Sequence, residues 1–207
     1  MTLVTVVSGD LPQAAADAFV RDGIVAIDTE TSGLDWRTAE LQLCQLYSEP
    51  TGAVLVRDVR SYPRQLARVL RSEEVLKAFH FAPFDLRFIA SKWGIDVVRL
   101  ACTKAASKLL DPELPADAHT LESISNRYLQ VSLSKGSVRT SDWGAAELTA
   151  EQLSYAVADV EHLPALLQQV ESRLRSAGKY GTWRAVCDYM PIAARLAVDG
   201  VPDPLVY

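Results

Sequence analysis

The residues best suited to chemistry follow an apolar run, Ile24 to Ile27, which leads directly into Asp28 and Glu30. Side chains two positions apart on a strand point to the same face, so these two carboxylates are expected to lie together. Two carboxylates held this closely repel each other unless a cation lies between them. The spacing therefore favours a metal-binding pair, although an isolated D-x-E also fits a turn cap followed by a solvated glutamate.

Two more acids occupy positions from which they could join this pair. Asp85 follows a predicted strand and falls in the first turn of a predicted helix, where the helix dipole alone also favours an acid. Tyr155 and Asp159 are four residues apart on a predicted helix, which places the phenol and the carboxylate on one face. A core tyrosine beside an exposed aspartate would give the same spacing. This motif therefore indicates a functional site only in combination with the other acids.

A layered fold must position these acids, and the hydrophobic pattern predicts one. Strands are expected at residues 3–7, 24–28, 41–47, 53–56 and 75–81, with a weaker strand at 95–98. The three runs between residues 24 and 56 have short connections, which predicts an antiparallel meander. Helical patterns separate the other runs and dominate from Thr103 onward, with one long segment from about Thr149 to Ala177. This order predicts an α/β fold around a mixed sheet, with a helical C-terminal part.

Length and composition favour a single globular domain that spans residues 1–207. The 207 residues are 49% hydrophobic, which is enough for one well-packed core and short for two. The N-terminus, MTLVTVVSGD, lacks the basic segment and cleavage site of a secretion signal, and no apolar run is long enough to cross a membrane. We therefore expect a cytoplasmic protein without membrane association.

Charge and cysteine content exclude further classes. Cys44, Cys102 and Cys187 are too few and too widely spaced for a disulfide framework or a zinc site. A net charge of −5 argues against binding that tracks many phosphates along a duplex. It is compatible with a short nucleic-acid ligand, because acids that gather around divalent cations contribute negative charge that the metals neutralise.

Taken in chain order, the three motifs resemble those of the DEDDy class of 3′-to-5′ exonucleases. Residues 140–166, TSDWGAAELTAEQLSYAVADVEHLPAL, look like the ribonuclease D group, in which S-D-W precedes a helix that ends in Y-A-x-x-D-V-x-x-L. The segments HFAPFD, CTKAASKLL and CDYMPIAARL are similar to the single-domain bacterial branch called nano-RNase C. Together these similarities cover nearly the whole chain.

The resemblance implies an RNase H-like mixed five-stranded sheet flanked by helices, with four acids that bind two divalent cations, Mg²⁺ or Mn²⁺. It assigns Asp28 to both ions, Glu30 and Asp159 to the ion that activates water, and Asp85 to the ion that stabilises the leaving 3′ oxygen. Hard oxygen ligands suit both metals. Tyr155 would orient the attacking water, because a phenol with its usual high pKa is a poor base.

The resemblance also implies a substrate and an assembly. The expected activity is 3′-5′ exoribonuclease action on short oligoribonucleotides or dinucleotides, with release of nucleoside 5′-monophosphates, by a homo-oligomer whose expected form is a ring-like octamer. Candidate substrate contacts near the acids are Thr29, Thr31, His80, Phe84, Lys135 and Trp143. Lys135 and Trp143 precede the late helix and could hold a phosphate or stack a base, while a solvated loop fits them equally well.

The sequence is compatible with three other functions. Action on single-stranded DNA or longer RNA uses the same chemistry. A non-catalytic nucleic-acid-binding module would retain the fold, but it would be expected to have lost an acid, and all four are present. A phosphatase with an aspartate nucleophile in a D-x-D-x-T motif fits less well, because Glu30 and Ser32 replace its second aspartate and its threonine.

Overall fold

The computed structural model describes residues 3–133 and 141–205, and in this part of the chain six strands form one mixed sheet. The strands are β1 (Val4–Ser8), β2 (Ile24–Thr31), β3 (Leu41–Ser48), β4 (Gly52–Arg57), β5 (Leu76–Phe79) and β6 (Leu100–Cys102), arranged in the order β1-β4-β3-β2-β5-β6. The pairs β2–β3 and β3–β4 are antiparallel, which confirms the predicted meander. The pairs β1–β4, β2–β5 and β5–β6 are parallel.

The sheet has one more strand than the five predicted, and the weak strand at 95–98 is wrong. Ile95 and Val97 are buried, which explains the apolar pattern. Their segment does not join the sheet, and the backbone N–H of Val98 donates to Leu70 O at 3.2 Å. The strand β6 begins only after Arg99, whose φ of 47° redirects the chain.

Helices connect the strands and make up the second half of the chain. They are α1 (Gln13–Asp22), α2 (Arg64–Leu70), α3 (Ala82–Trp93), α4 (Thr103–Leu110), the 3₁₀ turn η1 (Ala116–His119), α5 (Leu121–Leu129), α6 (Ala150–Glu161), α7 (Leu163–Ser176) and α8 (Tyr180–Val198). The single long helix predicted from Thr149 to Ala177 is wrong, since α6 ends at Glu161. Pro164, which has no N–H to donate, lies in the first turn of α7 and explains the break.

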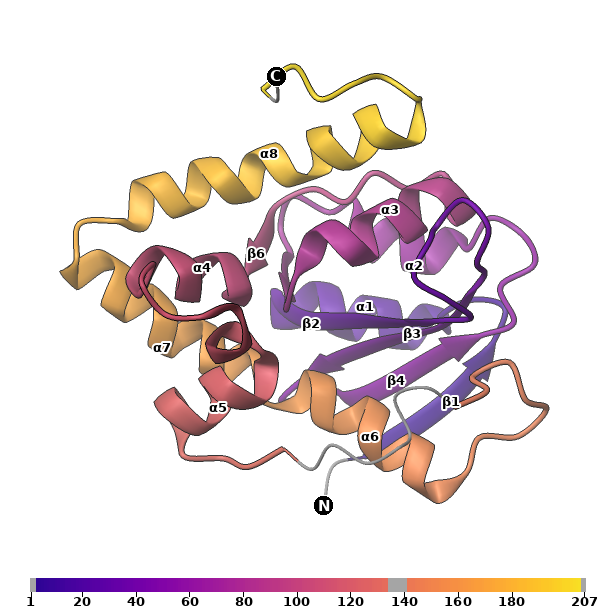
Figure 1. The fold of residues 1–207 in the computed structure, drawn as a ribbon. Coiled ribbons are helices and arrows are strands. Elements are labelled where there is room, and N and C mark those ends of the chain that lie inside the picture. Colours follow the sequence, from indigo (N-terminus) through magenta and orange to yellow (C-terminus); the bar gives the residue numbers. More distant parts are fainter. Residues whose placement is uncertain (1–2, 134–140, 206–207) are drawn as a thin grey trace.

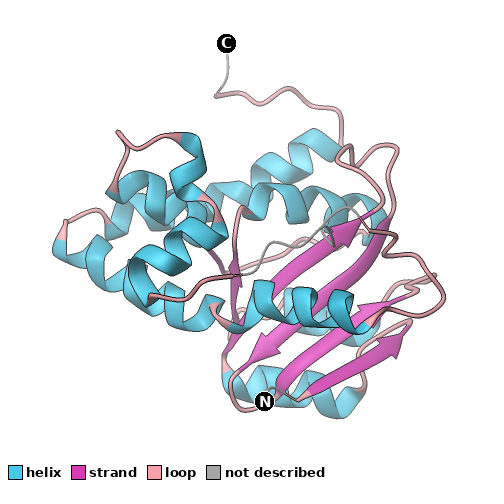
Figure 2. Cartoon of the chain, turned by 60° about the horizontal axis from the view of Figure 1, so that its bottom comes forward, coloured by secondary structure: helices cyan, strands magenta, loops and turns pink. Residues whose placement is uncertain are grey.

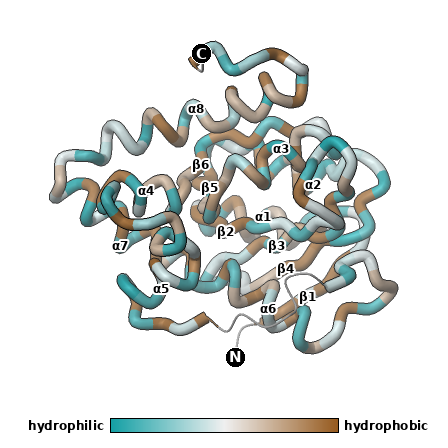
Figure 3. Tube along the Cα trace, viewed as in Figure 1, coloured by the Kyte–Doolittle hydropathy of each residue, from teal (hydrophilic) through white to brown (hydrophobic). Residues whose placement is uncertain are grey.

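Helices cover both faces of the sheet. Figure 1 shows α6 crossing the front of the sheet and α1 lying behind it, and α6 contacts β2, β3 and β4. Figure 2 shows the strands between these helices, with a separate group of helices at one side. Hydrophobic residues concentrate along the strands and on the helix faces turned toward them (Figure 3). Within the described residues, no helix is both long and apolar enough to cross a bilayer.

Two groups of buried side chains hold this arrangement together. The larger group joins the sheet to α1, α2, α3, α7 and α8. The smaller group packs Leu43 and Leu55 of the sheet against Trp143 and Ala156, with Tyr155 at its margin. Because this smaller group lies between the sheet and α6, it fixes the height of α6 above β2 and β3.

Candidate active site

Asp28 and Glu30 lie on β2, on the face of the sheet that α6 covers. Their cross-strand neighbours on β3 are Gln45, opposite Asp28, and Leu43, opposite Glu30. Gln45 is fully buried, and its Nε2 lies 3.5 Å from Asp28 Oδ2 and 3.4 Å from Glu30 Oε1. The amide therefore donates toward both carboxylates, which orients them and offsets part of their mutual repulsion.

The second wall of the site exists because β2 is longer than its neighbour β5. β5 pairs only with residues 24–26 of β2, so the edge of β2 beyond Ala26 is left open on that side. The start of α3 occupies this space and brings Asp85 beside the strand. Asp85 is only 2% exposed, and its Oδ1 accepts a hydrogen bond of 2.7 Å from Thr29 Oγ1.

The third group of site residues comes from α6, which brings Tyr155 and Asp159 over the sheet. A capping box starts this helix, because Thr149 Oγ1 accepts from the N–H of Gln152 and Gln152 Oε1 accepts from the N–H of Thr149. The ring of Trp143 packs against that of Tyr155, with the centroids 6.0 Å apart. The phenol is thus held by the core on one side while its hydroxyl reaches the acids.

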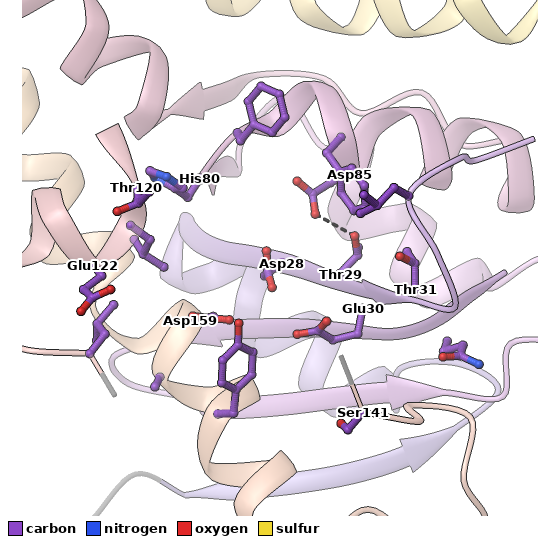
Figure 4. Close-up of a pocket in the computed structure, with 18 of the residues that line it drawn as sticks. Asp28, Thr29, Glu30, Thr31, His80, Asp85, Thr120, Glu122, Ser141 and Asp159 are labelled. Carbon is purple, nitrogen blue, oxygen red and sulfur yellow. Dashed lines mark hydrogen bonds between the residues drawn. The ribbon is translucent and has the colours of Figure 1, made fainter. Parts of the chain in front are cut away.

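The four acids converge although they come from three separate elements. One carboxylate oxygen each of Asp28, Glu30 and Asp159 lies within 4.8 Å of the others. Figure 4 shows Asp28 at the centre, with Asp85 on one side and Glu30 and Asp159 on the other. A site of this kind, built only of carboxylate oxygens, is chemically suited to a hard divalent cation such as Mg²⁺ or Mn²⁺.

The electrostatics of the four acids also favour a bound cation. Burial raises the pKa of Asp28 well above its usual range, and the negative charges of Asp85, Asp159 and Glu30 raise it further. Burial raises the pKa of Asp85 to about 7, against the lowering effect of its hydrogen bond from Thr29. Burial, followed by the charge of Asp159, also raises the pKa of Tyr155, so its hydroxyl stays protonated and available as a donor. A bound cation would offset the burial and mutual repulsion of these acids, because it favours their ionised forms.

These residues line a cavity of about 760 Å³. All five residues predicted to be catalytic reach it, and so do Thr29, Thr31, His80 and Phe84 from the predicted substrate contacts. Lys135 lies outside the described residues. Trp143 is 1% exposed and does not line the cavity, because it is packed between Leu43, Leu55 and Ala156. Its place in the structure is therefore beneath Tyr155 and away from a substrate.

The sequence pattern did not indicate several residues at this site, and Gln45, Phe81 and Lys104 are the ones that bear on its chemistry. Gln45 was detectable as a polar residue within an otherwise apolar strand, at a position that pairs with Asp28. Phe81 and Lys104 line the cavity itself, with Lys104 Nζ 4.4 Å from the centre of the Phe81 ring. Their contact joins α3 to α4, and no local sequence pattern indicates it.

Residues 9–175 match the model of the 3′-5′ exonuclease family. Ribonuclease D of Zymomonas mobilis subsp. mobilis is 30% identical over 165 residues, which cover 79% of this chain. The chain spans about two fifths of the length of that relative, since the match covers 41% of it.

Solved structures agree with this assignment. Brucella melitensis NrnC with bound Mg²⁺ matches with a TM-score of 0.89 and 31% identity over 100% of both chains. Escherichia coli RNase D matches with a TM-score of 0.79, over 92% of this chain and 50% of its own, but at 22% identity it supports the fold alone. The four acids, the mixed sheet and helices that position them, and these matches agree, and the chain belongs to the 3′-5′ exonuclease family.

Proposed function

We propose that this protein is a metal-dependent 3′-5′ exoribonuclease that degrades short oligoribonucleotides, including dinucleotides, and releases nucleoside 5′-monophosphates. The observation that carries the proposal is the convergence of Asp28, Glu30, Asp85 and Asp159, with Tyr155, in one cavity. Membership of the 3′-5′ exonuclease family supports the same reaction.

We propose that the four acids hold two divalent cations, Mg²⁺ or Mn²⁺. Asp28 is the shared ligand, because the other three acids surround it. Glu30 and Asp159 complete one position, and Asp85 supports the other. When bound, two such cations supply activation of water and stabilisation of the leaving oxygen in phosphodiester hydrolysis.

The side chains around the acids position the reactants. Tyr155 keeps its proton, so it donates a hydrogen bond that orients the attacking water and does not act as the base. Thr29 holds Asp85 in place through its hydroxyl, and Gln45 does the same for Asp28 and Glu30. We assign Thr31, His80 and Phe84, which line the same cavity, to contacts with the bound nucleotide.

A short RNA substrate is supported by the size and charge of the site. A cavity of about 760 Å³ is of the size that holds small ligands, and the net charge of −5 gives little attraction for a long backbone. The similar Brucella melitensis NrnC has been solved bound to pGG, at 31% identity and over 100% of both chains. Single-stranded DNA or longer RNA remains the alternative substrate that the assay must test.

We further propose that residues 1–207 act as one catalytic domain within a homo-oligomer, for which a ring-like octamer is the expected form. Val186 and Ile192 of α8, with Val201 and Leu205 beyond it, are exposed apolar residues that suit subunit contacts. Size-exclusion chromatography with light scattering would measure the mass.

The buried thiols of Cys44, Cys102 and Cys187 suit the reducing cytoplasm, where we place the activity.

The test is hydrolysis of 5′-labelled RNA and DNA, from two to twenty nucleotides long, with Mg²⁺ or Mn²⁺. Stepwise shortening from the 3′ end with nucleoside 5′-monophosphate as product is expected, and EDTA should stop it. Preference for DNA, or faster turnover of the longest strands, would favour the alternative substrates. Binding of RNA without hydrolysis in either metal would instead indicate a non-catalytic module and overturn the proposal.

A further inference from the structure

Phe81 adopts a backbone conformation that is rare for an aromatic residue. Its φ of 71° and ψ of 47° lie in the left-handed region, which bulky side chains occupy only under strain. It stands directly before α3, the helix that carries Asp85. Strained residues of this kind cluster at functional sites, where the surrounding structure holds them in place.

The neighbouring contacts fix this conformation. His80 Nδ1 lies 3.0 Å from Thr103 Oγ1, and Thr103 Oγ1 donates to Phe79 O at 3.2 Å. These contacts tie the chain just before Phe81 to the first residue of α4. On the other side, the N–H of Phe84 donates to Phe81 O at 3.0 Å. The residue is therefore held from both directions and does not move freely.

The strained backbone presents the ring to the cavity instead of burying it. Phe81 lines the cavity and keeps 46% of its surface exposed, whereas Phe79 and Phe88 nearby are fully buried. Figure 4 shows His80 and Asp85, which flank it in the chain, along one wall of the cavity, across Asp28 from Glu30 and Asp159. An exposed ring on this wall lies beside the proposed metal ligands without being one of them.

The charge of the cavity singles out Lys104, whose ammonium lies over this ring at 4.4 Å from its centre. Lys104 is the one lysine or arginine among the described residues that line the cavity. The same described lining holds six carboxylates: Asp28, Glu30, Asp85, Glu122, Asp142 and Asp159. In this described lining, the basic side chain that can attract a polyanionic ligand therefore lies beside Phe81. Aromatic rings paired with cations are a common means of holding nucleobases and their phosphates.

We propose that Phe81 and Lys104 form a nucleotide platform, in which the ring of Phe81 stacks on a base of the bound oligonucleotide and Lys104 contacts its phosphate. This inference rests on the proposed function and extends it, because it names the part of the substrate that these residues recognise. Stacking on a ring tolerates all bases. The platform therefore selects for the presence of a base and not for its identity.

The test compares Phe81→Asn with wild type on an intact diribonucleotide and on two analogues, each with one of its bases replaced by hydrogen. Asparagine tolerates the left-handed conformation, so this variant removes the ring without adding backbone strain. The kcat/KM for the intact dinucleotide should fall roughly tenfold or more, mainly through KM. The loss should be at least severalfold smaller on one of the two analogues. Equal losses on all three substrates, or no loss on any, would overturn the platform.

Control variants separate stacking from folding. Phe81→Tyr keeps a ring and should retain the wild-type preference for the intact dinucleotide. Tyr62→Ala removes a ring that is 49% exposed outside the cavity lining, and it should leave the kcat/KM for all three substrates unchanged. Lys104→Met should weaken binding and reduce its salt dependence relative to Lys104→Arg. A Phe81→Tyr variant that loses the preference as Phe81→Asn does would count against stacking.

Failure of the proposed function can be told apart from failure of the platform. If the wild type hydrolyses neither the intact dinucleotide nor its analogues with Mn²⁺, the proposed function in dinucleotide degradation fails. The platform is then judged by dinucleotide affinity from calorimetry with Ca²⁺ present. Weakening by roughly tenfold in Phe81→Asn supports it, and unchanged affinity overturns it.

Discussion

The substitution Asp85→Asn is expected to stabilise the metal-free protein at neutral and alkaline pH. In the folded chain, burial raises the pKa of Asp85 from 3.8 to about 7. The carboxyl group therefore holds its proton more tightly when folded than when unfolded. The stability contributed by this proton is fully present below pH 3.8 and is lost as the pH rises through about 7. Asparagine removes this loss, and its carbonyl can still accept the hydrogen bond from Thr29.

The size of the effect follows from the two pKa values. Between pH 5 and pH 8, the shift at Asp85 corresponds to a loss of about 3 kcal/mol in the free energy of unfolding. For a chain of this size, each kcal/mol changes the Tm by roughly 2–4 °C. The Tm of the metal-free wild type should therefore fall by roughly 6–12 °C more than that of Asp85→Asn over this pH range.

The assay is thermal unfolding followed by circular dichroism at pH 5, 6, 7 and 8 in EDTA. Asp117→Asn, which replaces an exposed acid in η1, is the control and should follow the wild type. Added Mg²⁺ should raise the Tm of the wild type at pH 8 more than that of Asp85→Asn, because a bound ligand stabilises the state that binds it. Equal pH dependence of the Tm for wild type and Asp85→Asn would refute this reasoning.

Three further results are expected. Tyr155→Phe should lower kcat strongly and leave Mg²⁺ affinity by calorimetry unchanged, since it removes only the hydroxyl; an unchanged kcat would reduce Tyr155 to a packing residue. Gln45→Met should move the pH midpoint of Mg²⁺-dependent activity upward, because Asp28 and Glu30 lose a donor that favours their ionised forms, and an unmoved midpoint would contradict this. A two-nucleotide RNA should have a higher kcat/KM than a twenty-nucleotide RNA, and the reverse order would reject the short-substrate proposal while leaving the exonuclease assignment intact.

The sequence predicts the centre of the fold well because its strands there have short connections and strong apolar patterns. The meander that carries Asp28 and Glu30 is an example. Prediction fails where residues are buried like those of a strand but do not form the hydrogen bonds of the sheet. Ile95 and Val97 are buried like strand residues, yet β6 forms only at Leu100–Cys102. It also fails at α6 and α7, where apolar periodicity continues through the break before Pro164.

The candidate site was predictable to the extent that its residues follow local rules. The spacing of Asp28 and Glu30, and that of Tyr155 and Asp159, fixes which side chains share a face. The distance between those pairs is set by the packing of Trp143 beneath α6, which no spacing reveals. The left-handed backbone of Phe81 was equally hidden, because phenylalanine carries no preference for that conformation and only contacts made across the fold impose it.

The most direct test of the two-cation exonuclease proposal is single-turnover hydrolysis of a 5′-labelled diribonucleotide by wild type and Asp28→Ala, with Mn²⁺ and with EDTA. Circular dichroism should first establish that the variant is folded. The wild type should release nucleoside 5′-monophosphate only in the presence of the metal, and Asp28→Ala should show no more product than the EDTA control. Turnover by Asp28→Ala close to that of the wild type would contradict the proposal that Asp28 is the ligand shared by both cations.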